Sequence, residues 1–285
     1  MSCSISATPF ATMHAFHHRT GPIVAKVGGT TLEDASSAPA LWRALIDLHH
    51  AHPGGVIILH GGGKAVDRQM DRLGFTTERR EGIRITPDDQ VEEITGVLAG
   101  RINKALVGTL NVMGAKAVGL CLGDGGAIAT AKTTRYAFDP GRVGEVVGGD
   151  GELLRVLLGN GYLPVVSSIG LDAGGKFLNV NGDDAAAGIA GVMGAAALML
   201  FTDVAGILDG QKKLVREITP AGIEKMVASG EISGGMIVKA RAAAAVAMKH
   251  RLPVLILSGN NPDSLRDWME GKESGTKIDL PSQTP

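Results

Sequence analysis

Short apolar runs alternate with helical segments along most of this 285-residue chain, and several of the runs end in glycine. Parallel strands need a long crossover between them, which is usually a helix. The alternation therefore predicts an α/β protein with a mostly parallel central sheet sandwiched between helices, an αβα sandwich. The expected strands are residues 23–27, 56–59, 117–122, 163–167, 197–202 and 254–257, and the expected helices begin near Ala38, Lys64, Pro87, Glu152, Asp183, Pro220, Met236 and Pro262.

The helix expected near Pro87 has the clearest start signals. Thr86 is a candidate N-cap and Pro87 suits the first helical position. A stripe of apolar residues at helical period follows as far as Leu106. Residues 128–134 and 170–180 lie between expected strands and predict β-hairpins.

Composition excludes several classes of protein. The formal net charge of −1 gives no basic footprint for nucleic acid or a membrane surface. No apolar run reaches the roughly 20 residues that a membrane span needs. Cys3 and Cys121 lack metal-type spacing and predict free thiols in a reducing, cytoplasmic compartment. Many glycines (41) with few aromatic residues (4%) favour an α/β enzyme over a β-sandwich.

Two segments have plain interpretations. Residues 1–20 are rich in Ser, Thr and Ala, carry no acids, and make a poor signal or transit peptide, so we expect a flexible leader. His49, His50 and His52 follow an expected helix and lack cysteine partners. A solvated helix end is therefore favoured over a metal site for these histidines.

The run at 56–59 ends at His60 and is followed by three glycines and a helical pattern. Bare amides and a helix N-terminus bind anions, so a phosphate, a carboxylate or an acyl-enzyme oxyanion would all fit. The spacing is neither a Walker A loop nor a dinucleotide fingerprint. "HGGG" resembles a lipase oxyanion motif, but no G-x-S-x-G nucleophile elbow exists in the chain.

Charged residues at three other positions have a functional and a plain interpretation. Lys26 lies within an expected strand, where a charge must be paired or face outward on an edge. Asp183 begins a helix and could simply cap it. Lys239 lies in the first turns of a helix, where a solvated lysine is common. Each signal alone leaves both interpretations open.

Taken in order, eight segments resemble the amino acid kinase family over nearly all of the chain from Ile23 to Ile278. "GIRIT" together with "NVNGD" resembles those members that phosphorylate N-acetyl-L-glutamate in the second step of arginine biosynthesis. The segments are "AKVGGT", "ILHGGGKAVD", "GIRITPDDQVEEITGVLAGRINKAL", "AVGLCLGDGG", "GYLPVVSSIG", "FLNVNGDDAA", "FTDVAGILDG" and "GGMIVKARAA".

The resemblance implies that a substrate carboxylate attacks the γ-phosphorus of ATP directly. A carboxylate is already ionised at neutral pH and needs no base, so the protein positions the reactants and neutralises charge. By resemblance, Lys26 and Lys239 flank the phosphoryl group and Asp183 holds both ammonium groups. Backbone amides would contact the phosphoryl group and the attacking carboxylate, and the glycines implied are Gly28, Gly29, Gly62 and Gly63.

The resemblance also assigns the two ends of the site. Arg84 would grip the α-carboxylate of the substrate with its planar fork, and Asn179 would read the α-carboxylate and acetamido end. Magnesium would be held by the ATP phosphates, with no metal ligands from the protein. The adenosine pocket would be lined by Asp203, Gly206, Ile207, Leu208 and Ile232.

For the whole chain, the resemblance implies one kinase domain at 21–285. An acetylglutamate-binding lobe would span about 21–180 and an ATP-binding lobe about 181–285. A homodimer paired through the 87–110 helix is expected. In "MEGKESGTKI", Glu273 replaces the first glycine of a GxGT stretch that marks arginine-inhibited hexamers in the family, so strong arginine inhibition is not expected. The alternatives are a kinase for an aminoadipate derivative and a non-catalytic ligand sensor.

Overall fold

A computed structural model of the chain describes residues 19–28, 32, 38–232, 234–261 and 263–280. Its main sheet consists of β1 (Ile23–Val27), β2 (Val56–His60), β5 (Ala117–Cys121), β8 (Leu163–Ser167), β11 (Ala197–Thr202), β12 (Glu217–Ile218), β13 (Val254–Ser258) and β14 (Thr276–Ile278). The strand order is β12-β14-β13-β11-β1-β2-β8-β5, and all neighbours are parallel except β13 and β14. The expected mostly parallel sheet is confirmed.

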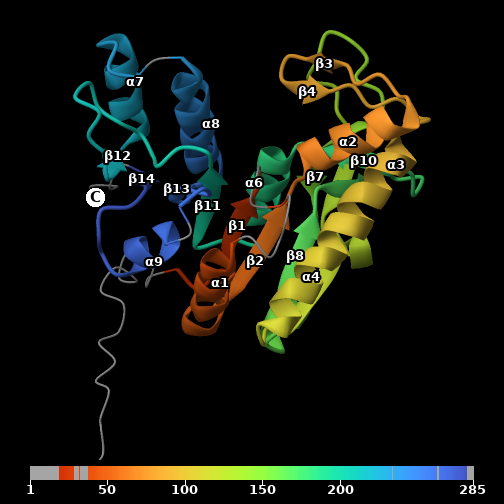
Figure 1. The fold of residues 1–285 in the computed structure, drawn as a ribbon, viewed down its shortest axis with the longest axis horizontal. Helices are drawn as coiled ribbons and strands as arrows, with labels where there is room; N and C mark the ends of the chain where they lie inside the picture. Colours follow the sequence, from red (N-terminus) through yellow and green to blue (C-terminus); the bar gives the residue numbers. More distant parts are fainter. Residues whose placement is uncertain (1–18, 29–31, 33–37, 233, 262, 281–285) are drawn as a thin grey trace, which may run out of the picture.

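Helices cover both faces of this sheet (Figure 1). One face packs on α1 (Pro39–Ala51), α4 (Asn103–Val112) and α9 (Ser264–Met269). The opposite face packs on α5 (Glu152–Gly159), α6 (Gly182–Val192), α7 (Pro220–Ala228) and α8 (Gly235–His250). The strands alternate between the two cores, since Ile23, Ala25 and Val27 face the first and Val24 faces the second. The other helical segments are α2 (Gly63–Leu73), α3 (Val91–Thr95), the π-helix η4 (Gly96–Ile102) and the 3₁₀ turn η5 (Asp124–Gly126).

Two smaller sheets lie above the N-terminal half. β6 (Ala129–Lys132), β7 (Val143–Gly148), β9 (Ile169–Leu171) and β10 (Phe177–Val180) form one in the order β6-β7-β10-β9, and β3 (Arg79–Arg80) pairs with β4 (Ile83–Arg84) in the other. The hairpin at 170–180 is confirmed as β9–β10, and 128–134 supplies β6, which pairs with β7.

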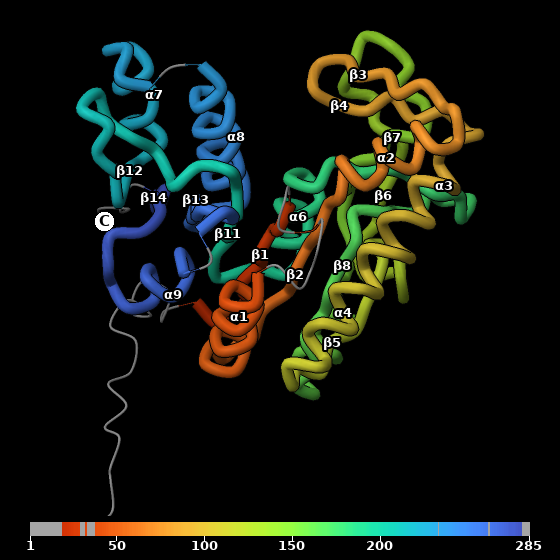
Figure 2. The backbone as a smooth tube through the Cα atoms, in the orientation of Figure 1, coloured from red at the N-terminus to blue at the C-terminus, as the bar shows by residue number. Residues whose placement is uncertain are grey.

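Figure 2 shows β1 and β2 at the middle of the molecule, with α7 and α8 on one side and α3 and α4 on the other. The sheet is continuous across the proposed boundary between lobes near residue 180, because β1 pairs with both β2 and β11. The leader expected at residues 1–20 lies outside the described residues except for Arg19 and Thr20. No helix among the described residues has both the length and the apolar character to cross a membrane.

The expected helix start at Thr86 and Pro87 is wrong. The helical segment begins at Val91, and Thr86 instead forms a parallel bridge with Gly141. The Thr86 hydroxyl donates to the Arg84 carbonyl at 3.1 Å, so it serves the loop rather than a helix cap. The segment then passes through the π-helix η4 before α4, a local distortion that amphipathic period does not reveal.

The apolar stripe of this segment belongs to the core of the chain itself. Ile94, Leu98 and Ile102 pack in one buried cluster with residues of α2, and Leu106 packs under the main sheet. The stripe is therefore part of the core, and the expected pairing of a homodimer through the 87–110 helix stays a prediction. A dimer using this segment would have to use its other faces.

The prediction that the histidines at the end of α1 are solvated is also wrong for two of the three. His49 and His52 are buried, and both make hydrogen bonds. The His49 Nδ1 accepts from the Val56 amide at 3.0 Å, and the His52 Nε2 lies 2.9 Å from the Gly21 carbonyl oxygen. These two histidines join the end of α1 to the loops that enter the sheet.

Candidate active site

The two glycine loops leave the sheet side by side. In the register of β1 with β2, Val27 lies opposite His60, so Gly28 and Gly61 follow at the same level. Both loops lie at the carboxyl ends of parallel strands, the edge where ligands of α/β proteins bind. The sequence thus places two bare backbones against one site.

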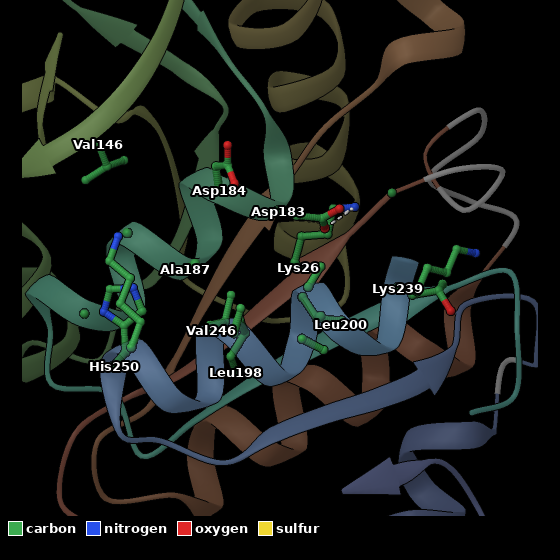
Figure 3. A pocket seen from close by; sticks show the side chains of 18 of the residues that line it. Lys26, Val146, Asp183, Asp184, Ala187, Leu198, Leu200, Lys239, Val246 and His250 are labelled. Atoms are coloured by element: carbon green, nitrogen blue, oxygen red, sulfur yellow. Dashed lines mark ion pairs between the residues drawn. The ribbon is translucent and has the colours of Figure 1, made fainter. Parts of the chain in front are cut away.

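Lys26 and Asp183 form an ion pair at this edge. The Lys26 Nζ lies 2.9 Å from the Asp183 Oδ1, and Figure 3 shows the two side chains pointing at each other. The Lys26 side chain is 18% exposed, on a central strand rather than an edge. Asn181 caps the N-terminus of α6, because its Oδ1 accepts a hydrogen bond from the Asp183 backbone N–H at 2.9 Å. The Asp183 side chain is therefore not the helix cap.

Lys239 was expected to be held by Asp183, but in the structure it forms its ion pair with Asp203. Lys239 lies on α8 and Asp203 follows β11, so the pair joins two elements on the C-terminal side of the sheet. The Lys239 ammonium, through its hydrogen bond, holds the pKa of the Asp203 carboxyl below its usual range. In Figure 3 the end of the Lys239 side chain lies to one side of the Lys26–Asp183 pair. The sequence predicted one carboxylate between the two lysines, whereas in the structure each lysine pairs with its own aspartate.

Both ion pairs border a cavity of about 1000 Å³. Its polar end carries these four side chains with Gly28, and its floor is apolar, with Leu198 and Val246 labelled in Figure 3. Arg135 also lies at this cavity, where it bridges Asp184 at 2.5 Å and Glu145 at 3.0 Å. Sequence reasoning did not single out Arg135, because its partners lie on other elements.

A second cavity of about 150 Å³ lies on the other side of the α6 N-terminus. It is lined by Gly61 to Gly63, by Arg84 and by Asn179. Asn181 and Gly182 also line this smaller cavity, whereas the next residue, Asp183, lines the larger one. The two cavities therefore meet where α6 begins.

Arg84 is a buried cation in the smaller cavity, with 8% of the residue exposed. Its guanidinium forms an ion pair with Asp67 of α2. It also donates to the Thr77 hydroxyl at 3.0 Å and to the Gly63 carbonyl at 3.3 Å. These bonds fix the plane of the guanidinium beside the glycine loop, which suits recognition of a carboxylate.

Asn179 is fixed by the loop that carries Arg84. Its Nδ2 donates to the Thr86 hydroxyl at 3.0 Å, and that hydroxyl donates to the Arg84 carbonyl. Thr86 therefore links the two residues expected to bind substrate. The sequence predicted Thr86 as a helix N-cap, because Asn179 and Gly141, its partners here, are distant in the chain.

One glycine of the second loop, Gly62, is needed for close packing. A Cβ at Gly62 would lie 2.2 Å from the Ile102 Cδ1 and 2.9 Å from the Leu98 Cδ2, both on η4. Gly62 also has a φ of +153°, which a side chain disfavours. Gly63 begins α2, and Gly29 of the first loop lies outside the described residues.

The residues expected to contact adenosine lie in and near the loop after β11. Gly206 packs against Thr276, whose hydroxyl accepts the Ile207 amide at 2.8 Å. Ile207 and Ile232 are buried in the core beside α7 and α8, while Leu208 is exposed. Of this group, Asp203 borders the larger cavity. Contact of the others with a nucleotide stays a prediction.

His60 lies buried at the base of the second glycine loop, and sequence reasoning assigned it no role either. It ends β2, is fully buried, and touches both Gly61 and Asn103. Burial lowers the pKa of His60 to about 4. Asn103 begins α4, far along the chain, so no local motif shows this contact. Among the described residues, no group of three or more His, Cys, Asp or Glu side chains is arranged to hold a metal ion.

Known proteins share this architecture. Acetylglutamate kinase of Proteus mirabilis (strain HI4320) is 40% identical over 257 residues, which are 90% of this chain and 98% of that protein. The N-acetylglutamate synthase structure from Neisseria gonorrhoeae with coenzyme A and N-acetyl-glutamate has a TM-score of 0.79 at 20% identity, covering 95% of this chain and 62% of that chain.

A carbamate kinase structure from Giardia lamblia, bound to AMP-PNP, has a TM-score of 0.61 at 17% identity and covers 92% of this chain and 99% of that chain. At these identities the two structures show the fold alone. The family model described as "Amino acid kinase family" matches residues 21–258. With two glycine loops and two lysine–carboxylate pairs at one sheet edge, and with this match over most of its length, the chain belongs to the amino acid kinase family.

Proposed function

We propose that this chain transfers the γ-phosphoryl group of ATP to the side-chain carboxylate of N-acetyl-L-glutamate. The product is N-acetyl-L-glutamyl 5-phosphate, the second intermediate made in arginine biosynthesis. The observation that carries the proposal is the Lys26–Asp183 pair at the point where two cavities meet, with Lys239 bordering the larger one. The 40% identity to an acetylglutamate kinase supports the choice of substrate.

The two cavities differ in size as two such substrates do. The larger cavity, about 1000 Å³, has room for a nucleotide, and the smaller one, about 150 Å³, suits a small acid. Attacking carboxylate and γ-phosphoryl would meet beside Lys26 at the α6 N-terminus. The positive end of the helix and the ammonium would both stabilise the charge that spreads over the phosphoryl oxygens.

Arg84 and Asn179 support an acid with a neutral acetamido group. Arg84 is already neutralised in part by Asp67, and its fork would bind the α-carboxylate. Asn179 would hydrogen-bond the acetamido end, where the ammonium of free glutamate would lack a good partner. Gly62 and Gly63 would offer backbone amides to the reacting carboxylate.

Catalysis then consists of positioning and charge neutralisation. Lys26 would hold the phosphoryl group from one side, oriented by Asp183. Lys239 would approach from the other side, which requires it to exchange Asp203 for the ATP phosphates. Magnesium, proposed to arrive with ATP, would neutralise phosphate charge when bound. Gly28 and Gly29 are proposed phosphate contacts, and Gly206, Ile207, Leu208 and Ile232 are proposed to form the adenosine side.

We also propose a cytoplasmic homodimer with one kinase domain at 21–285, divided near residue 180 into an acid-binding and an ATP-binding lobe. Cys121, the cysteine among the described residues, is a free thiol, which is compatible with a reducing compartment. Burial raises the pKa of the Cys121 thiol, which makes it a poor nucleophile near neutral pH.

A coupled assay of ADP release tests the activity. The acceptors to compare are N-acetylglutamate, N-acetyl-aminoadipate, glutamate, aspartate and UMP. We expect N-acetylglutamate to be preferred. Preference for the longer acid would reassign the chain to an aminoadipate kinase, and ATP binding without acid-dependent ADP release would support a non-catalytic sensor.

A further inference from the structure

We propose that His60 is a positioning residue that aims the Gly62 amide at the substrate. The His60 ring holds the carbonyl of Gly61, and this fixes the peptide that carries the Gly62 N–H. The proposal rests on the proposed function, in which this amide contacts the reacting carboxylate. It gives a role to a fully buried polar side chain at the base of the glycine loop.

The direction of each hydrogen bond around His60 follows from its neighbours. The Asn103 Oδ1 accepts from the Lys104 ammonium at 3.2 Å, and the Asn103 Nδ2 lies 2.9 Å from the Val165 carbonyl oxygen, which can only accept. The Asn103 amide is therefore fixed in one orientation. Its Nδ2 lies 3.0 Å from the His60 Nε2 and must donate to it.

An Nε2 that accepts carries no proton. The proton of the neutral His60 ring then lies on Nδ1, which is 2.9 Å from the Gly61 carbonyl oxygen. That carbonyl only accepts, so the Nδ1–H donates to it. Burial keeps the ring neutral near pH 7 and so keeps this tautomer in place.

A trans peptide transmits this bond to the substrate side of the loop. The C=O of Gly61 and the N–H of Gly62 share one plane and point in opposite directions. With the carbonyl held by the buried ring, the Gly62 N–H points away from the ring, and Gly62 lines the smaller cavity. A glycine loop has many accessible backbone angles, so such a restraint is what a fixed donor needs.

The π-helix supports the same loop from its side. Leu98 and Ile102 of η4 leave no room for a Cβ at Gly62, and Asn103 follows η4 directly. The widened π turn therefore brings an apolar contact and a polar contact to one loop. π-bulges are frequent at functional sites, and here the reason is the packing of this loop.

Two substitutions at His60 separate its two nitrogens. In His60→Asn the amide nitrogen occupies the place of Nδ1 and can still donate to Gly61. In His60→Gln the amide group reaches the place of Nε2 and can contact Asn103, while the bond to Gly61 is lost. We expect His60→Gln to lower kcat about 10- to 100-fold with the KM for ATP near wild type, because a misaimed donor fails mainly in the transition state. His60→Asn should retain at least about tenfold more of kcat than His60→Gln.

The controls separate positioning from stability. His52→Asn removes a buried histidine bond at the opposite edge of the sheet, and it should lower the melting temperature with little effect on kcat. Equal kcat for the two His60 variants would overturn the proposal. ¹⁵N NMR of the wild-type His60 ring gives a second readout, in which a protonated Nε2 would also overturn it. A wild-type chain inactive on N-acetylglutamate would instead refute the proposed function, and the ring tautomer would then decide the claim about His60.

Discussion

Three side chains of the site are held by partners that only the folded chain brings together. Lys26 lies beside Asp183, Lys239 beside Asp203, and Arg84 beside Asp67. Burying a cation without an anion costs desolvation free energy. Each carboxylate therefore allows its cation to stay charged at the site before substrate binds. Substitutions at Lys239 and at Arg84 test whether these two cations also contact the substrates.

Lys239→Ala should lower kcat by at least about 100-fold, with a smaller effect on the KM for N-acetylglutamate, because the charge matters most in the transition state. Steady-state ADP release at saturating ATP measures it. Arg241→Ala is the matched control on the same helix, since it removes an exposed ion pair with Glu224 and should leave kcat unchanged. A kcat for Lys239→Ala close to wild type would mean that Lys239 is a surface lysine.

Arg84→Lys should raise the KM for N-acetylglutamate and leave the KM for ATP near wild type. A lysine cannot reproduce the planar fork that contacts Asp67, Thr77 and Gly63. Initial rates with each substrate varied in turn measure the two constants. Arg72→Lys, at the exposed end of α2, is the control. A change confined to the KM for ATP would assign Arg84 to the nucleotide instead.

The buried His60 should make stability depend on pH. Its pKa is lowered from 6.5 to about 4, so below about pH 6.5 the unfolded chain binds a proton that the native chain does not. This contribution to stability is complete above the unfolded pKa and is lost as pH falls toward the folded value. Between about pH 7 and about pH 5 the wild type should lose about 2 kcal/mol more than His60→Asn. Urea unfolding at both pH values measures this, and parallel losses in the two proteins would contradict it.

At the scale of elements, α4 and β5 meet through a polar contact rather than apolar packing alone. A Cβ at Gly119 of β5 would lie 1.9 Å from the Asn103 Oδ1 and 2.6 Å from the Lys104 Nζ. The Lys104 ammonium also donates to the Gly119 carbonyl at 3.1 Å. Glycine at this strand position is required by the close approach of the helix.

Gly119→Ala should therefore destabilise the fold by about 1–3 kcal/mol, because the added methyl group displaces Asn103. Gly159→Ala is the matched control. It lies in the last turn of α5 with no atom within 4 Å of the added Cβ, and alanine should stabilise the helix by up to about 1 kcal/mol. Thermal unfolding measures both, and equal effects of the two changes would show that the Asn103 contact does not resist displacement.

At the scale of the molecule, strands that are buried on both faces could be predicted well from the sequence. β1, β8 and β11 match the expected runs at both ends, because each is a short, mostly apolar run followed directly by a glycine or a polar residue. β12 and β14 were missed, since a strand of only two or three residues has no period of its own. The π-helix was missed because apolar spacing alone does not reveal a widened turn.

The candidate site shows the same limit. Glycine loops and a lysine near a strand end are visible as local patterns, and the structure brings Lys26, Asp183 and the described glycines of both loops together as expected. Contacts that form only in the tertiary fold could not be predicted from the sequence. Examples are the contact of Lys239 with Asp203 and that of His60 with Asn103. Each joins elements that are far apart in the sequence, so only the sheet order places them together.

The oligomeric state is a property of the whole molecule. We predict a homodimer paired through exposed faces of the segment from η4 to α4, since its apolar stripe is already buried within the chain. Val112, which ends α4 with 90% exposure, lies on such a face. Light scattering gives the mass, and Val112→Glu should shift it toward the monomer because the charge would be buried in the interface.

Arginine should not inhibit this chain strongly. In the stretch after α9, Gly275 has a positive φ of +70°, and a Cβ there would lie 2.6 Å from the Leu257 Cδ2. Glu273 is an exposed residue in place of the first glycine. A side chain at that position removes the backbone freedom that the arginine-inhibited pattern retains. Light scattering with and without arginine, beside the ADP assay, tests the prediction. A hexamer mass together with inhibition at sub-millimolar arginine would contradict it, and Glu273→Gly is the variant that would then show whether this position matters.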